Sequence, residues 1–216
     1  MNYAELLKAN GGRGRIIRDP GKIFVTARLM APTKNLYGVY TASEDTSPSE
    51  IYPGGLLPFN FILTSAGANQ NNQFFVEDEI AQADVYNSVI GEPINEDHEQ
   101  SFHAIVGEVR TSSFIQAAGG IPSSIKCSGC VFANQYPRVA YKVYLGAGRW
   151  AAISMEAIPQ PLEQVGKYLV VHNPKFVGAA LVRFPACPHA QIDPIGSSSK
   201  SQSAAILKAA VDKLLH

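Results

Sequence analysis

Hydrophobic and polar residues alternate in short blocks along most of the chain, and Gly, Pro or Asn separates the blocks. Residues 103–110 show the pattern well, because Ile105, Gly107 and Val109 fall on one face. A period of two is typical of a β-strand with one buried face. This pattern, or a run of β-branched and aromatic residues, predicts strands at 23–29, 58–64, 73–76, 84–90, 103–110, 128–133, 138–145, 149–158, 168–172 and 177–184.

Turn signals recur about every ten residues, which is typical of an all-β sandwich or barrel. Strands do not alternate with helical patterns, so a doubly wound nucleotide-binding fold is not expected. The sequence shows no internal repeat at a fixed period. We therefore expect one all-β domain over residues 23–194.

The two ends of the chain have a different character. Residues 2–8 are expected to form one or two helical turns, and a Gly-rich stretch with four positive charges follows. These charges are Arg13, Arg15, Arg18 and Lys22. They predict a flexible basic arm within residues 1–22 that could neutralise phosphates.

A second amphipathic segment lies at the other end. Residues 195–203 are a Gly/Ser-rich linker, and 204–215 carry an apolar face at helical spacing. That face comprises Ile206, Leu207, Ala210, Val211, Leu214 and Leu215. We expect a tethered helix that packs on the sandwich, associates with copies of itself or contacts a membrane.

Composition narrows the function classes. The chain has 216 residues, a size typical of one domain, with 18 basic and 18 acidic residues and a net charge of zero. Its charged fraction of 17% is below the roughly 25% of typical soluble domains. A neutral balance argues against a protein that works mainly as a basic nucleic-acid binder. Low charge favours a surface that contacts other protein.

The cysteines predict a reducing compartment. Three cysteines do not form a disulfide framework, and the first residues lack the apolar core of a secretory signal. No run of about 18 apolar residues occurs, so no membrane span is expected.

Cys127 and Cys130 form a C-x-x-C pair, and Cys187 with His189 could complete a four-ligand zinc set. The opposing interpretation is ordinary buried cysteines, since two residues three apart in a strand point to opposite faces. This second interpretation is favoured.

Three acidic groups could each hold a calcium ion at a subunit contact, because Ca²⁺ prefers oxygen ligands. A solvated polar loop is the favoured alternative for each, and no cofactor is predicted. The remaining histidines are scattered, and no hydrolase, Walker or dinucleotide-binding motif occurs. We expect no enzyme activity. The three acidic groups considered above as calcium sites are Glu44-Asp45, Glu77-Asp78-Glu79, and Glu96-Asp97 with Glu99.

Two stretches carry a resemblance to a known family. The first stretch is residues 102–113, which end in a Thr-Ser-Ser step and lead to Ser128-Gly129-Cys130-Val131-Phe132. The second stretch is residues 173–191, which precede the tethered helix. With the order of arm, strands, linker and helix, they resemble the single jelly-roll capsid proteins of small icosahedral positive-strand RNA viruses, especially the noda-like group. The likeness is one of pattern over most of the chain.

The resemblance implies an antiparallel jelly-roll sandwich of about eight strands, with a short N-terminal arm and a C-terminal amphipathic helix. It implies a capsid protein that self-assembles into an icosahedral shell around the RNA genome, in the host cytoplasm and then in the virion. Its partners would be many copies of itself, genomic RNA through the arm, and a membrane through the helix. The arm is shorter than the long Arg-rich arm usual in that group, and no self-cleavage residue is carried over.

Three other functions stay open. A carbohydrate- or ligand-binding sandwich would use exposed aromatic residues such as Trp150 or Tyr136 near Glu77 and Asp78. A phage tail-type structural protein would share the low charge and long polar loops. A metal-dependent enzyme would use the cysteine and histidine set described above.

Overall fold

The computed structural model describes residues 1–17, 55–99, 101–146, 152–158, 161–182, 185–190 and 192–194. The strand predicted at 23–29, the linker and the helix predicted at 204–215 lie outside these residues, as do Arg18, Lys22 and Trp150.

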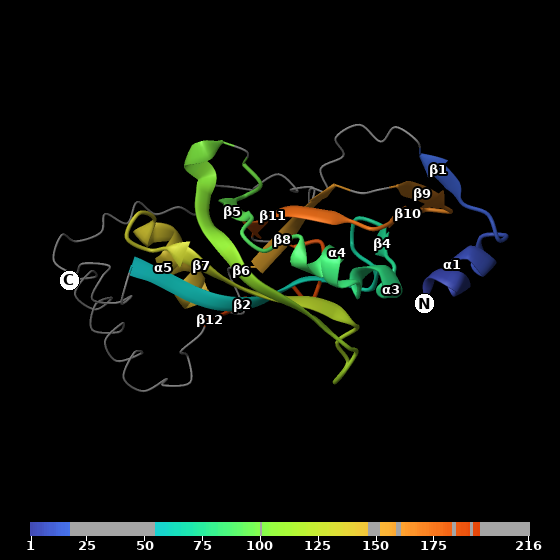
Figure 1. Ribbon diagram of the computed structural model, residues 1–216, viewed down its shortest axis with the longest axis horizontal. Coiled ribbons are helices and arrows are strands. Elements are labelled where there is room, and N and C mark those ends of the chain that lie inside the picture. Colours follow the sequence, from blue (N-terminus) through green and yellow to red (C-terminus); the bar gives the residue numbers. More distant parts are fainter. Residues whose placement is uncertain are drawn as a thin grey trace.

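The described residues are mostly β-structure, with short helices between some of the strands (Figure 1). The helices are α1 (Tyr3–Ala9), α3 (Glu77–Ile80), α4 (Ala83–Asn87), the 3-10 turn η2 (Phe102–Ala104) and α5 (Pro137–Gly146). The strands are β1 (Arg15–Ile17), β2 (Leu56–Ser65), β3 (Gly67–Ala68), β4 (Gln73–Phe75), β5 (Pro93–Glu96), β6 (Ile105–Ile115), β7 (Ser124–Phe132), β8 (Ala152–Ile158), β9 (Leu162–Val165), β10 (Tyr168–Val171), β11 (Lys175–Val182) and β12 (Ile192–Pro194).

These strands form two mixed sheets within the described part of the chain. The larger has the order β12-β2-β7-β6-β5-β11-β8, and the smaller has the order β1-β9-β10-β4-β3. Their arrangement agrees with the predicted all-β sandwich. The prediction of wholly antiparallel pairing is wrong for two pairs, since β10 lies parallel to β4 and β11 parallel to β5. Side chains alternate between the two faces in parallel and antiparallel strands alike, so the alternation does not reveal the direction of a strand's neighbour.

Two predicted strands are helices. Residues 84–90 lie mainly in α4, and residues 138–145 lie in α5. In α4 and the turn that follows it, Val85 and Val89 are both buried, and their spacing of four is helical. In α5 the buried residues Val139, Ala140 and Val143 show the same spacing. Local β-branched composition favoured strands there, and burial of one helical face outweighs it.

Some short strands lie where none was expected. The segment β5 was predicted as a polar loop, and β9 lies between two predicted strands. Another, β1, falls in the predicted flexible arm, where Arg15 pairs with Gln164 and Ile17 with Leu162. The helix predicted at residues 2–8 is confirmed as α1, capped by reciprocal hydrogen bonds between Asn2 and Glu5.

One apolar core joins the two sheets. From the larger sheet, alternate residues of β2 enter it, among them Phe59 and Phe61. From the smaller sheet, Phe75, Leu162 and Val171 enter the same cluster. These side chains are at most 3% exposed, so the faces that meet are dry.

The smaller sheet is also covered on its outer face. Phe74, the neighbour of Phe75 on β4, points the other way and packs with Val165, Val170 and Leu6. Leu6 belongs to α1, which lies against this sheet at one end of the molecule (Figure 1). The N-terminal helix is therefore part of the packed structure.

Gly107 sets the spacing of the central strands. It lies on β6 opposite Val131 of β7, and a Cβ at this position would overlap the backbone carbonyl oxygen of Cys130. Two backbone segments can approach this closely only where no side chain stands between them.

We expect Gly107→Ala to destabilise the fold by about 3 kcal/mol, because the two central strands must separate to admit the methyl group. Urea unfolding followed by circular dichroism measures this change. Ser113→Ala, at an exposed position of the same strand, is the matched control and should change stability by less than about 0.5 kcal/mol. Equal effects of the two substitutions would contradict the close approach.

Candidate functional site

The predicted basic arm is described only in its first half. Arg13 lies between α1 and β1, and Arg15 lies on β1; both are exposed. This half is ordered as an edge strand on β9. Arg18 and Lys22 lie outside the described residues.

The cysteine and histidine set does not converge on one point. Cys127 belongs to the core cluster, whereas the Cys130 thiol lies on the opposite face, 4.0 Å from Glu108 Oε1. The Cys187 thiol lies 3.5 Å from the Ser65 hydroxyl. All three cysteines are free and buried. Within the described ranges, no group of three His, Cys, Asp or Glu side chains is arranged to hold a metal ion.

Burial controls the chemistry of these thiols. Loss of hydration raises the pKa of Cys127 to about 12 and also raises the pKa of Cys130. A thiol with a raised pKa is a poor nucleophile at neutral pH because little thiolate is present.

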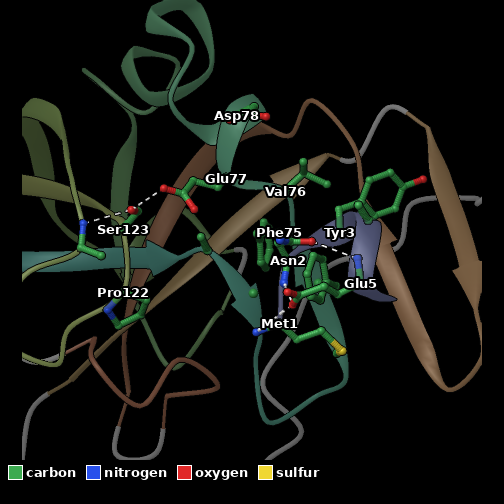
Figure 2. A pocket seen from close by; sticks show the side chains of 15 residues that line it. Met1, Asn2, Tyr3, Glu5, Phe75, Val76, Glu77, Asp78, Pro122 and Ser123 are labelled. Atoms are coloured by element: carbon green, nitrogen blue, oxygen red, sulfur yellow. Dashed lines mark hydrogen bonds and ion pairs between the residues drawn. The ribbon is translucent and has the colours of Figure 1, made fainter. Parts of the chain in front are cut away.

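The acidic run at residues 77–79 does not form a common oxygen cage. Glu77 accepts a hydrogen bond from the Ser123 hydroxyl at 2.6 Å, and Glu79 turns to His172. Figure 2 shows Glu77 and Ser123 pointing toward one another, with Asp78 away from them. In the other acidic group, Glu99 accepts a hydrogen bond from Ser101. The pair Glu44-Asp45 lies outside the described residues.

A pocket of about 780 Å³ lies beneath the N-terminal helix (Figure 2). Its walls come from α1, from β3 and β4, from the start of α3 and from the segment before β7. They combine apolar residues such as Phe75 and Val76 with acidic residues such as Glu5 and Glu77. This mixed lining could hold a small amphipathic molecule.

A polar cluster that the sequence did not predict joins α1 to the smaller sheet. His172, just after β10, has Nδ1 at 2.8 Å from Glu79 Oε1 and Nε2 at 2.9 Å from Glu163 Oε2. The Tyr3 hydroxyl donates to Glu163 Oε2 at 2.5 Å. The backbone N–H of Asn173 donates to Glu79 Oε2 at 2.7 Å. Three segments far apart in sequence meet here, those of Tyr3, of Glu79 and of the β9–β10 hairpin, so no local motif predicts the cluster.

Its members are held rigidly. The rings of Tyr3 and His172 meet edge to face, with centroids 5.5 Å apart. Burial, together with the hydrogen bond to Glu163, raises the pKa of Tyr3 to about 12. The phenol therefore keeps its proton and donates throughout the physiological pH range.

A second histidine pair is buried in the larger sheet. His98 Nδ1 lies 3.1 Å from Glu156 Oε1, and the two side chains are only 7% and 6% exposed. The pair joins the turn after β5 to the edge strand β8. The pair is therefore shielded from solvent within the described part of the larger sheet.

No protein-family model matches the chain, and no curated protein matches its sequence. None of the described helices is long and apolar enough to cross a membrane.

We expect the native protein at pH 8 to react with a disulfide reagent at least about fiftyfold more slowly than the denatured chain, because all three cysteines are buried and few thiolates form at Cys127 and Cys130. Release of the coloured thiol product over time measures this. A native reaction that accelerates after a chelator is added would contradict free thiols and would indicate metal-bound cysteines.

Proposed function

We propose that this chain is a structural subunit that assembles with copies of itself into a closed shell around RNA, as its resemblance to noda-like capsid proteins implies. In this proposal a jelly-roll sandwich forms the wall of a virion that assembles in the host cytoplasm. The two packed sheets support a sandwich wall, and the two parallel strand pairs are a departure from a simple jelly roll.

The observation that carries the proposal is a pair of sheet edges that each bear an exposed isoleucine. Within the described ranges, β1 and β8 each end a sheet and have a strand partner on one side only. Ile16 on β1 is 56% exposed, and Ile158 on β8 is 49% exposed. Edge strands of monomers are usually blunted by charge or proline, because an open edge pairs with another chain.

The side chains of β8 fit this role. Residues Ala152–Ala157 are buried, so both faces of the strand are covered while its outer edge has no described partner. Its one charged residue, Glu156, is turned inward to His98 and does not repel a neighbour. An uncharged open edge favours pairing with a second copy.

The partners of the shell follow from the two ends of the chain. Arg13 and Arg15 are exposed and available to phosphates, and many copies on one surface would bind RNA more tightly than one. Contact with a membrane through residues 204–215 is a further part of the proposal and lies outside the described residues.

The expressed protein should sediment as large uniform particles that are round in negative-stain electron microscopy. Ile16→Lys or Ile158→Lys should raise the concentration needed for assembly by about tenfold, because a charge would be buried at each contact. Ile90→Lys is the matched control, since Ile90 is 45% exposed in a turn and not on an edge strand.

A wild-type protein that stays monomeric across concentration, salt and added RNA would overturn the shell proposal. The pocket beneath α1 would then favour the ligand-binding alternative. Assembly of both edge variants at the wild-type concentration would show that other surfaces join the subunits.

The double variant Arg13→Ala/Arg15→Ala should bind single-stranded RNA with a weaker salt dependence. The slope of log K against log salt should fall by about 0.7 for each phosphate that the variant no longer neutralises. Filter binding at several salt concentrations measures it. Arg110→Ala/Lys126→Ala removes two exposed charges from the larger sheet and should leave the slope unchanged; the reverse result would place the RNA on that sheet.

A further inference from the structure

Helix α1 is held to the rest of the protein by two kinds of contact. Leu6 is fully buried against Phe74, Val165 and Val170. Tyr3 joins the polar cluster through its hydrogen bond to Glu163. A seven-residue helix is too short to be stable alone in water, so its order depends on these contacts.

The chain turns at the end of the helix, where the Gly12 N–H donates to the Leu7 carbonyl oxygen at 2.8 Å. Gly11 and Gly12 follow the helix with φ of 77° and 73°, a region that residues with side chains rarely adopt. They separate α1 from strand β1, which is fixed by its pairing with β9. Helix α1 and strand β1 are therefore held by different contacts, α1 by Leu6 and Tyr3 and β1 by its pairing with β9.

The geometry at His172 sets its protonation. Each ring nitrogen faces a carboxylate oxygen within hydrogen-bond distance, that of Glu79 on one side and Glu163 on the other. An ionised carboxylate accepts hydrogen bonds and donates none, so both contacts are hydrogen bonds only when both ring nitrogens carry a proton. A neutral ring has only one N–H, and its other nitrogen would direct a lone pair at a carboxylate.

We propose that the cluster of Tyr3, Glu79, Glu163 and His172 is a proton-dependent clasp that holds helix α1 docked while His172 is an imidazolium. When His172 loses a proton, its ring can donate to only one of the two carboxylates. The Glu163 oxygen that faces His172 Nε2 is the same atom that accepts from Tyr3, so this one oxygen links the histidine to the helix.

The direction of the pH dependence follows from the groups that face His172. Burial lowers its pKa, but hydrogen bonds and charge from Glu79 and Glu163 outweigh burial and raise it. The His172 contribution is thus complete below about pH 6.5, the ordinary histidine value, and is lost as pH rises through the raised value.

Glu163 limits the clasp on the acid side. Burial raises its pKa, but hydrogen bonds from Tyr3 and His172 outweigh burial and lower it. Its contribution is complete above about pH 4.3, the ordinary glutamate value, and is lost as pH falls through the lowered value. The clasp is therefore tightest between about pH 4.3 and 6.5, and α1 loosens as the solution becomes alkaline.

The test is hydrogen–deuterium exchange of the full-length protein between about pH 6 and pH 9, read by mass spectrometry and corrected for intrinsic exchange. The amides of α1 are compared with those of the central strand β7. In the wild type, corrected exchange of α1 should rise by about tenfold over this range, with β7 unchanged, because one charge-assisted hydrogen bond is lost.

His172→Gln removes the titrating group and should make corrected α1 exchange fast and independent of pH. His103→Gln, at an exposed histidine, is the matched control and should keep the wild-type profile. The proposal is overturned if wild-type α1 exchange does not change with pH, or if His172→Gln keeps the wild-type profile.

If His172→Gln also loses protection in β7, that variant has unfolded. Tyr3→Phe then provides the test. Tyr3→Phe keeps every charge of the cluster and removes the hydrogen bond from helix α1 to the Glu163 carboxylate. It should speed α1 exchange by about tenfold near pH 6 without changing β7. Unchanged α1 exchange in this variant overturns the clasp. The readout does not require assembly, so its failure and that of the shell proposal are distinguishable.

Discussion

The smaller sheet must bury both of its faces, and much of the remaining structure depends on this constraint. Neighbouring residues of a strand point to opposite sides, so Phe75 enters the core between the sheets while Phe74 points outward. Val171 and Val170 repeat the division on β10. The outer apolar face requires a cover, and α1 provides it through Leu6. A short terminal helix thereby becomes part of the fold, and the polar cluster at its edge gains a structural role.

Sequence periodicity predicted the β-rich class and most of the long strands, because β2, β6, β7 and β11 each have a strong alternating or β-branched pattern. It failed at α4 and α5, where the same residue types are buried at helical spacing. Intrinsic preference for a strand is weak compared with burial of a whole face. Parallel pairing of β4 with β10, and of β5 with β11, depends on the fold as a whole and leaves no local mark.

The candidate sites likewise divide into those that a local pattern predicts and those that depend on tertiary structure. The sequence could predict that Cys127 and Cys130 point to opposite faces of the sheet, because side chains alternate with a period of two along a strand. The cluster around His172 could not, because Tyr3, Glu79 and Glu163 approach it from separate elements that only tertiary structure brings together. The exposed isoleucines Ile16 and Ile158 could be located only from the structure, because their positions on the edge strands β1 and β8 depend on the order of strands in each sheet.

The pairing of β1 with β9 has a consequence for the order of folding. Residues 15–17 are synthesised well before their partners, residues 162–164. At cellular rates of synthesis the strand waits on the order of ten seconds for the rest of its sheet. Local segments such as the β6–β7 hairpin can form before then, since loop closure is faster and entropically cheaper for near neighbours in the chain. Strand β1 thus finds its place late, after β2, β5, β6, β7 and β8 of the larger sheet have all been synthesised.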